Sequence, residues 1–148
     1  MSTITRLIED GCVAGVKATN GYKADSQVLA YRTDDFSIAK LERRIEVVCI
    51  AAMDTGWNSQ AQIVNPAIIV FSCQTPQASD PGASIVDDLL GYVREFLHSP
   101  GIADVISAGG GGGLHIFPGS VRVGPEGKIP NNVLNIYQIN LRLGAQIR

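Results

Sequence analysis

The chain has 148 residues, 12 of them Lys or Arg and 14 Asp or Glu, and 45% of the residues are hydrophobic. A domain of this length holds a core without disulfides or metal, so small stapled scaffolds are excluded, and a charged fraction of 18% excludes a disordered chain. The net charge of −2 gives no general attraction to nucleic acid, so any such binding requires a local group of cations.

The first segment, residues 3–16, fits two structures. In one of them a turn at Asp10-Gly11 joins two short strands, because Asp-Gly is a strong hairpin signal. The other is a helix with one apolar face, formed by Ile4, Leu7, Ile8, Cys12, Gly15 and Val16. Since Gly11 and Gly15 would each cost a helix interior about 1 kcal/mol relative to alanine, we favour the hairpin.

Three strands are expected next, at Ser26–Tyr31, Arg43–Met53 and Ala67–Phe71. The third is apolar on both faces, which is typical of a central strand that is covered on one side and paired in an interface on the other. The second alternates between a face with Ile45, Val47, Cys49 and Ala51 and a face with Arg44, Glu46, Val48 and Ile50.

Two helices follow the strands. The first opens near Asp80 or Ser84, and the second begins after Ser99-Pro100. Both helices have apolar stripes that need cover from a sheet or from a partner. The stripes consist of Ile85, Leu89, Val93, Phe96 and Leu97 in the first helix and Ile102, Val105 and Ile106 in the second.

Five glycines, Gly109–Gly113, end the helical pair and have no expected regular structure. Beyond them we expect two strands, Leu114–Val123 and Val133–Leu143, separated by a turn region over residues 124–132. We expect residues 1–148 to form a single domain. The last strand has the strongest period-2 pattern in the chain, with Tyr137, Ile139, Leu141 and Leu143 alternating with Gln138, Asn140 and Arg142.

Neither histidine lies in a pattern typical of a catalytic site. His98 is placed at a helix C-terminus, where a cation is favoured, and His115 begins a strand. The glycine run lacks the Gly-Lys-Ser/Thr ending of a phosphate-binding loop. We therefore expect a protein that is not an enzyme, with no catalytic residue, metal, cofactor or small-molecule substrate.

The three cysteines, Cys12, Cys49 and Cys73, are far apart and have no metal-ligand spacing, so we expect reduced, buried thiols. No apolar run approaches the roughly 18–20 residues that span a bilayer, and the N-terminus has no signal segment. These features predict a soluble, cytoplasmic protein without a membrane partner. A mean hydropathy of +0.14 leads us to expect an oligomer in which apolar surface meets another subunit.

Polar and cationic side chains gather at two places. Lys40, Arg43 and Arg44 lie at the start of one expected strand, and Gln138, Asn140 and Arg142 line the polar face of the last strand. Side chains of these types on an antiparallel sheet contact RNA phosphates, sugars or splayed bases. The alternative is a solvated sheet face, because Glu46 lies on the same face as Arg44 and repels phosphate.

Three segments together resemble a known family. Leu41–Val47 begins with leucine, an acid and two bases and continues with alternating β-branched residues. Leu97–Ile106 has a Leu-x-Ser-Pro turn followed by an apolar helix, and the strand at Ile68–Phe71 leads through a loop into the first helix. In this order the segments resemble the coat proteins of single-stranded RNA bacteriophages over residues 1–108, with residues 114–148 as a C-terminal strand extension.

The resemblance implies an α+β fold: an antiparallel β-sheet with an N-terminal hairpin, two helices packing across a dimer partner, and extra C-terminal strands. It also implies a homodimer that assembles in the bacterial host cytoplasm into the icosahedral capsid of a virion around single-stranded genomic RNA, and members of the family bind an RNA hairpin. The implied RNA contacts are Lys40, Arg43, Arg44, Gln138, Asn140 and Arg142. The implied dimer interface consists of Ile69, Phe71, Leu89, Val93, Phe96 and Leu97.

The chain departs from the family at two points. The family places another strand between those that resemble Arg43–Met53 and Ala67–Phe71, and its chains usually end after the two helices. Residues 137–143 look like the missing strand, with an aromatic start and alternating polar residues. We therefore hypothesise that the C-terminal segment returns to fill this position in the sheet, with the glycine run providing the reach.

A second hypothesis is a tail-terminator or neck protein of a tailed bacteriophage, whose subunits form a ring at the head-to-tail junction. These small α/β proteins are similar to the chain in the order of strands, helices and terminal strands, and they begin with a helix. The structure of residues 3–16 therefore discriminates: a helix favours the ring protein and a hairpin favours the coat protein. A third interpretation, a small-ligand-binding or enzymatic domain, lacks the titratable cluster that catalysis needs.

Overall fold

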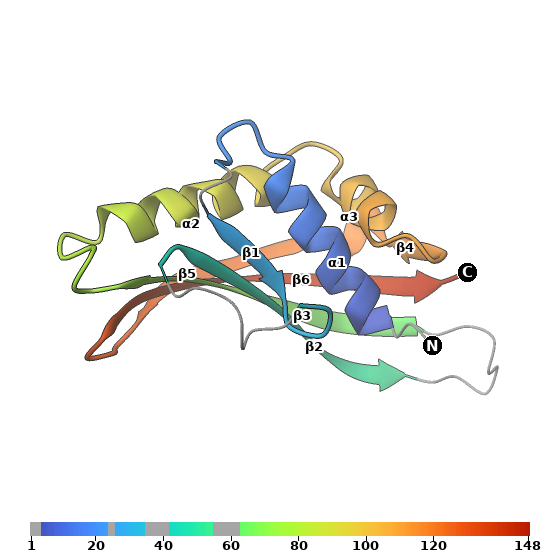
Figure 1. Cartoon of the computed structure of the whole chain (residues 1–148). Coiled ribbons are helices and arrows are strands. Elements are labelled where there is room, and N and C mark those ends of the chain that lie inside the picture. The colour runs from blue at the N-terminus through green and yellow to red at the C-terminus, as the bar shows by residue number, and fades with distance from the viewer. Residues whose placement is uncertain (1–3, 24–25, 35–41, 55–62) are drawn as a thin grey trace.

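Helices cover one face of a β-sheet in the computed structural model of the chain (Figure 1). The structure describes residues 4–23, 26–34, 42–54 and 63–148, and of residues 51–54 the backbone alone. Within these residues it has three α-helices and a six-stranded sheet, which confirms the α+β class. The elements are, in chain order, α1 (Ile4–Lys17), β1 (Gln27–Ala30), β2 (Arg44–Asp54), β3 (Ile63–Pro76), α2 (Ser84–Leu97), α3 (Ile102–Gly110), β4 (Leu114–Ile116), the 3-10 turn η2 (Pro118–Ser120), β5 (Arg122–Ile129) and β6 (Leu134–Ile147).

The strands follow the order β1-β2-β3-β6-β4, and β5 also pairs with β6. β1 runs parallel to β2, with Gln27 opposite Arg44, whereas the other described pairs are antiparallel. The sheet is therefore mixed, and the prediction of an antiparallel sheet is wrong at the β1 edge. Residues 31–43 connect β1 to β2, and a connection of about a dozen residues is long enough to bring the chain back in parallel.

The C-terminal strand β6 lies inside the main sheet, as hypothesised. It runs antiparallel to β3, with Leu141 opposite Ile69 and Asn140 opposite Val70. Its position differs from the hypothesis, however, because β2 pairs directly with β3 instead of being separated from it by a strand. β6 extends the sheet on the far side of β3, where its period-2 pattern turns one face toward the helices and the other face away.

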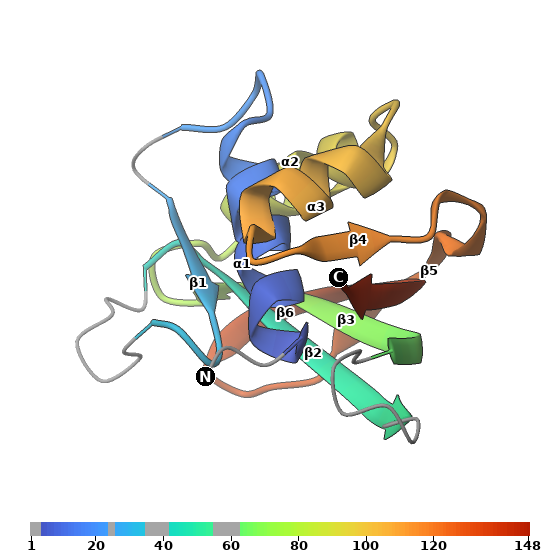
Figure 2. The ribbon, with the colours of Figure 1, turned by 90° about the vertical axis from the view of Figure 1, so that its right-hand side faces the viewer.

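The N-terminal segment forms helix α1, so the predicted hairpin is wrong. Both glycines that argued against a helix lie where α1 crosses the other helices (Figure 2). A Cβ on Gly11 would lie 3.0 Å from Cγ2 of Ile106 in α3, and a Cβ on Gly15 would lie 2.7 Å from Cδ1 of Phe96 in α2. Close packing of the three helices thus offsets the roughly 1 kcal/mol that each glycine costs locally.

The glycine run is divided between a helix and a turn. α3 extends through Gly110, and a Cβ on Gly109 would lie 3.1 Å from Cα of Gly11, so the first two glycines belong to the contact between α3 and α1. The three glycines that follow have φ values between 61° and 80°, which glycine adopts without strain. The expectation that the whole run lacks regular structure is therefore wrong for its first two residues.

The region after the glycines differs from the predicted pair of strands around one turn. Residues 114–123, expected as one strand, contain β4, η2 and the start of β5. Residues 124–127, expected as a turn, lie inside β5, whose pairing with β6 shifts register between Val123 and Glu126. Pro125 is tolerated there because β5 is an edge strand with an irregularity, where a missing backbone N–H breaks no central ladder.

One apolar core lies between the helices and the sheet. All three cysteines are buried in it as free thiols, as expected. Burial raises the pKa of Cys49 and of Cys73 to about 12, and it raises the pKa of Cys12 as well. The helices that the structure describes are all too short or too polar to cross a membrane.

A buried carboxylate joins α1 to the sheet. Glu9 is fully buried and accepts hydrogen bonds from the backbone N–H groups of Arg32, at 2.8 Å, and Cys49, at 2.9 Å, and it also pairs with the Arg32 guanidinium. Because β1 ends at Ala30, the Glu9 side chain takes over as hydrogen-bond acceptor for β2 beyond that point. α1 and the end of β1 are thereby fixed against the same stretch of β2.

Candidate interface on the open face of the sheet

The six residues expected at the dimer interface lie in the core of a single chain. Each is at most 3% exposed, and the rings of Phe71 and Phe96 meet edge to face with 6.1 Å between their centroids. The apolar stripe of α2 is thus covered by the chain's own sheet, and these side chains offer no surface to a partner. They are Ile69, Phe71, Leu89, Val93, Phe96 and Leu97.

The face of the sheet away from the helices, which we call the open face, is formed by alternate residues of β2, β3 and β6 (Figure 1). Register sets these side chains in rows across the three strands, so that Val48 lies beside Val70 and then Asn140. The open face consists of Arg44, Glu46, Val48 and Ile50 in β2, Ile68, Val70, Ser72 and Gln74 in β3, and Ile136, Gln138, Asn140 and Arg142 in β6, continued by Arg122 and Ile129 in β5.

Four of the six side chains expected to contact RNA share the open face: Arg44, Gln138, Asn140 and Arg142. Arg43 lies just before β2 and is half-buried, and Lys40 lies outside the described residues. The three polar residues of β6 come within reach of β2 because β3 alone separates the two strands. Sequence alternation therefore predicted which side chains share a face, although not where β6 would lie in the sheet.

Arg44 is held in a charge-balanced cluster at one end of the open face. Its Nη2 lies 2.6 Å from Oε1 of Glu46 and donates a hydrogen bond of 3.3 Å to Oε1 of Gln74. Nε2 of Gln74 in turn donates to Glu46 at 3.0 Å and to Oγ of Ser72 at 3.1 Å. With side-chain exposures of 11% and 18%, Arg44 and Glu46 neutralise each other, so this end has little charge to offer a phosphate.

The middle of the open face is apolar. Val48, Ile68 and Val70 are half-buried, while Ile50 is 59% exposed although it lies on an inner strand of the sheet. Ile129 of β5, 38% exposed, stands at the rim of the hollow of about 410 Å³ that this surface forms. A contiguous apolar surface of this kind is typical of a protein-protein contact rather than of a phosphate-binding surface.

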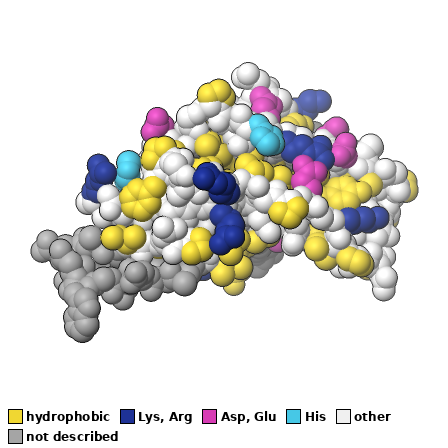
Figure 3. Space-filling model, turned by 180° about the vertical axis from the view of Figure 1, so that it is seen from behind, with side chains coloured by type: hydrophobic (Ala, Val, Ile, Leu, Met, Phe, Trp, Pro, Cys, Tyr) yellow, Lys and Arg dark blue, Asp and Glu magenta, His cyan; other side chains and the backbone are white. Residues whose placement is uncertain are grey.

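Arg122 is a cation of this face that sequence reasoning missed. It lies on β5 directly opposite Arg142 of β6, and both side chains are exposed. Figure 3 shows Lys and Arg side chains next to one another near the middle of the molecule seen from behind. Like charges opposite each other across a strand pair are destabilising, so the two arginines favour an anionic neighbour. The sequence did not indicate that the two arginines lie opposite each other, because residues 124–127 were expected to form a turn and not part of a strand paired with β6.

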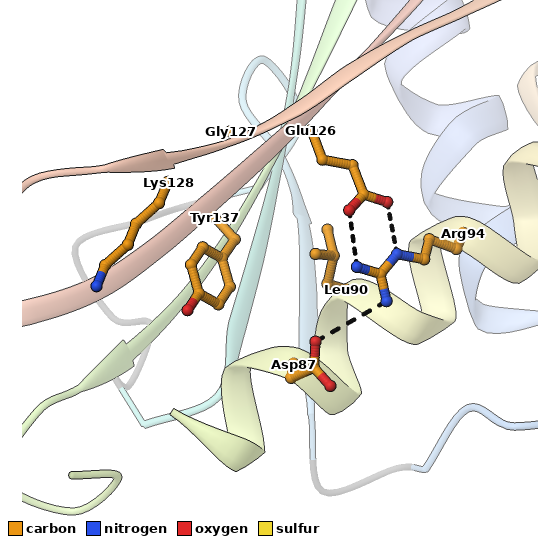
Figure 4. Close-up of a pocket in the computed structure, with 7 residues that line it drawn as sticks. All are labelled: Asp87, Leu90, Arg94, Glu126, Gly127, Lys128 and Tyr137. Carbon is orange, nitrogen blue, oxygen red and sulfur yellow. Dashed lines mark hydrogen bonds and ion pairs between the residues drawn. The ribbon is translucent and has the colours of Figure 1, made fainter. Parts of the chain in front are cut away.

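A separate pocket of about 230 Å³ lies between α2 and the β5–β6 pair (Figure 4). Arg94 of α2 binds Glu126 of β5 through two hydrogen bonds, from Nε at 2.5 Å and from Nη2 at 2.7 Å. Oδ1 of Asp87, on the same helix, lies 3.8 Å from Nη1 of Arg94. The hydrogen bond from Arg94 lowers the pKa of Glu126, and Glu126 raises the pKa of Arg94.

The other side of this pocket is formed by Tyr137 and Lys128, which lie apart from the ion pair in Figure 4. Two carboxylates already balance the charge of Arg94, so the arrangement serves as a clamp between helix and sheet. Elsewhere in the described part of the chain, His98 caps the end of α2, as predicted, and no group of three or more His, Cys, Asp or Glu side chains is arranged to hold a metal ion.

Compared with known protein families and with curated protein sequences, the chain matches none. Its function is therefore inferred from the residues and their arrangement. Two features support that inference: the order of elements beginning with α1, and a sheet face that no described element covers and that is neutral at one end, apolar in the middle and cationic beside β5.

Proposed function

We propose that the chain is the subunit of a ring at the head-to-tail junction of a tailed bacteriophage, of the tail-terminator or neck type. The observation that carries the proposal is helix α1 at Ile4–Lys17. Of the two families that the sequence resembles, the ring proteins begin with a helix and the coat proteins begin with a hairpin. The following order of β1 to β3, then α2 and α3, then β4 to β6, agrees with the same resemblance.

Two further observations support a ring protein over an RNA-packaging coat protein. The helices pack on the sheet of their own chain, with Phe96 and Leu89 fully covered, so this fold needs no dimer partner to bury them. On the open face, Glu46 neutralises Arg44 and the neighbouring Ile50 is apolar, which weakens the case for an RNA-binding surface.

A ring requires a particular kind of contact. Identical subunits close into a ring only when each uses two different surfaces, one toward each neighbour. The open face supplies an apolar surface of the kind that such contacts bury, on a chain whose own core is already complete. No cofactor or reaction centre is needed for this role, because the work of such a protein is to assemble.

The test is to express the full chain alone and to determine its assembly state over a range of protein concentrations. Native mass spectrometry would give the copy number, electron microscopy the shape, and the absorbance ratio at 260 and 280 nm any bound nucleic acid. We expect closed rings of one copy number without nucleic acid. Closed shells that contain RNA would overturn the proposal in favour of the coat protein, and a monomer at every concentration would overturn both.

A further inference from the structure

The helical side of the molecule presents an acidic surface on α2. Asp87, Asp88 and Glu95 occupy exposed positions on this helix. Gly91 lies between them and has no side chain, and the surface around it forms a hollow of about 420 Å³. We call these four residues and the hollow the α2 surface. α2 packs on the face of the sheet opposite to the open face (Figure 1), and the α2 surface consists of positions of this helix that are not buried against the sheet.

Cations also border the α2 surface, but they do not cancel its charge. Arg94 lines the hollow and is held by Glu126. Asp87 also lies 3.8 Å from Nη1 of Arg94, and Glu95 accepts hydrogen bonds from the neutral backbone N–H groups of Asn20 and Gly21. With Glu126 included, four carboxylates stand against two cations, Arg94 and Lys23, so the negative charge is in excess. The exposed basic residues of the helical layer, Arg6 and Lys17, belong to α1 rather than to α2. The α2 surface is therefore the part of this layer to which a cationic partner would be drawn.

The open face carries the complementary charge. Arg122 and Arg142 lie opposite each other on β5 and β6, both exposed, and neither forms an ion pair with a described residue. Ile68, half-buried, is the register neighbour of Arg142 on β3, and the exposed Ile50 follows on β2. Apolar surface beside two neighbouring cations matches a partner that offers carboxylates around an indentation.

Resting on the proposed ring function, we infer that the open face of one copy docks on the α2 surface of the next copy, with Arg122 and Arg142 facing Asp87, Asp88 and Glu95. The contact buries the apolar middle of the open face and places the two adjacent arginines against opposite charge. It is heterologous, because each copy contributes a different surface to each of its two neighbours.

The position of the two surfaces lets copies add one after another, which a ring requires. Since they are different surfaces of one subunit, every added copy leaves one open face and one α2 surface free at the ends, until rotation closes the circle. A contact between two open faces would bury the same apolar residues but would stop at a dimer. It would also bring Arg122 and Arg142 of one copy onto a face whose one carboxylate among the described side chains of β2, β3 and β6, Glu46, is bound to Arg44.

A charge exchange on the full chain tests the inference. We expect Arg142→Glu to raise the protein concentration at which half of the chains are assembled at least about tenfold, because it sets like charges against each other. Adding Asp88→Arg to the same chain is expected to restore assembly, whereas Asp88→Arg alone is expected to weaken it. Both residues are exposed, so circular dichroism, and the melting temperature at a concentration below that of wild-type assembly, should match the wild type and exclude misfolding.

A second pair of variants tests the apolar part. Ile50→Asp places a charge in the middle of the open face and is expected to prevent ring formation. Val133→Asp is the matched control, because Val133 is 68% exposed and lies between β5 and β6 outside the open face. We expect this control to assemble as the wild type does.

The outcomes separate this inference from the proposed function. If the wild type forms rings that Arg142→Glu and Ile50→Asp leave intact, the docking inference is wrong and the ring function stands. If the wild type forms no ring, the proposed function itself fails, and a wild-type dimer that Ile50→Asp separates would indicate pairing of two open faces. If Arg142→Glu instead removes copurified nucleic acid without changing assembly, the arginines contact nucleic acid and the docking inference is overturned.

Discussion

The ring of Phe96 in α2 fills the space beside Gly15 in α1, so closely that a Cβ on Gly15 would lie 2.7 Å from Cδ1 of that ring. This contact explains why a segment with two interior glycines is a helix. It also bears on the proposed function, because that proposal rests on α1 being a helix.

We expect Gly15→Ala to lower the free energy of unfolding by about 1–3 kcal/mol, because the added methyl group overpacks the helix contact. Gly91→Ala is the matched control: it lies inside α2, and an added Cβ there meets nothing within 4 Å. This control should gain about 1 kcal/mol from helix propensity. Urea denaturation at low protein concentration measures both, and a stabilised Gly15→Ala variant would contradict the packing explanation.

The wrong prediction of a hairpin at residues 3–16 shows which information could not be read from the sequence. A glycine carries a local cost that can be read from the chain, whereas the close approach that compensates it is a tertiary contact between residues far apart, such as Gly11 and Ile106. α2, β2 and β6 could be predicted because their apolar residues repeat at the period of the element. β5 could not, because Pro125 and its neighbouring glycines look the same in an edge strand as in a turn.

The candidate interface was predictable to a similar degree. Alternation placed Gln138, Asn140 and Arg142 on one face, which the structure confirms. Arg122 escaped notice because its significance depends on register with Arg142, and register is set by pairing that the sequence does not state. Burial of Leu89 and Phe96 under the chain's own sheet was equally hidden, since an apolar stripe does not reveal what covers it.

Asp80 should make stability depend on pH. Its side chain is 2% exposed, accepts a hydrogen bond of 2.7 Å from Oγ1 of Thr75, and caps α2 through the N–H groups of Ile85 and Val86. Burial by itself would raise the pKa of Asp80, but these hydrogen bonds to the charged form outweigh it and hold the pKa below its usual value of 3.8.

Because the folded-state pKa is lowered, the contribution of Asp80 is fully present above the unfolded value and is lost as pH falls through the folded value. We expect Asp80→Asn to cost about 0.5–2 kcal/mol at pH 7 and the difference from the wild type to shrink below pH 3.8. Urea denaturation at low protein concentration and at pH 7, 5 and 3 measures it, with the exposed Asp88→Asn as control. A difference that stays constant down to pH 3 would count against the proposed cap.

The thiols should be unreactive in the folded protein. Burial raises the pKa of Cys49 and Cys73 to about 12 and also that of Cys12, so little thiolate is present and reagents have no access. We expect an aromatic disulfide reagent at pH 8 to modify the native chain slowly and all three cysteines rapidly in concentrated urea. Rapid modification of one thiol before unfolding would show that its burial is incomplete in solution.

The bridge between Arg94 and Glu126 joins the helix that carries the α2 surface to the strand that carries Arg122. Its side chains are 40% and 38% exposed, so solvent screens the pair and we expect a coupling of less than about 1 kcal/mol at pH 7. Arg94 lowers the pKa of Glu126 below its usual 4.5, so the coupling should persist at neutral pH and disappear as pH falls through the folded-state value. A double-mutant cycle with Arg94→Gln and Glu126→Gln, read by urea denaturation at pH 7 and pH 3 in low salt, measures this coupling. Equal coupling at both pH values would mean that the two side chains interact by packing rather than by charge.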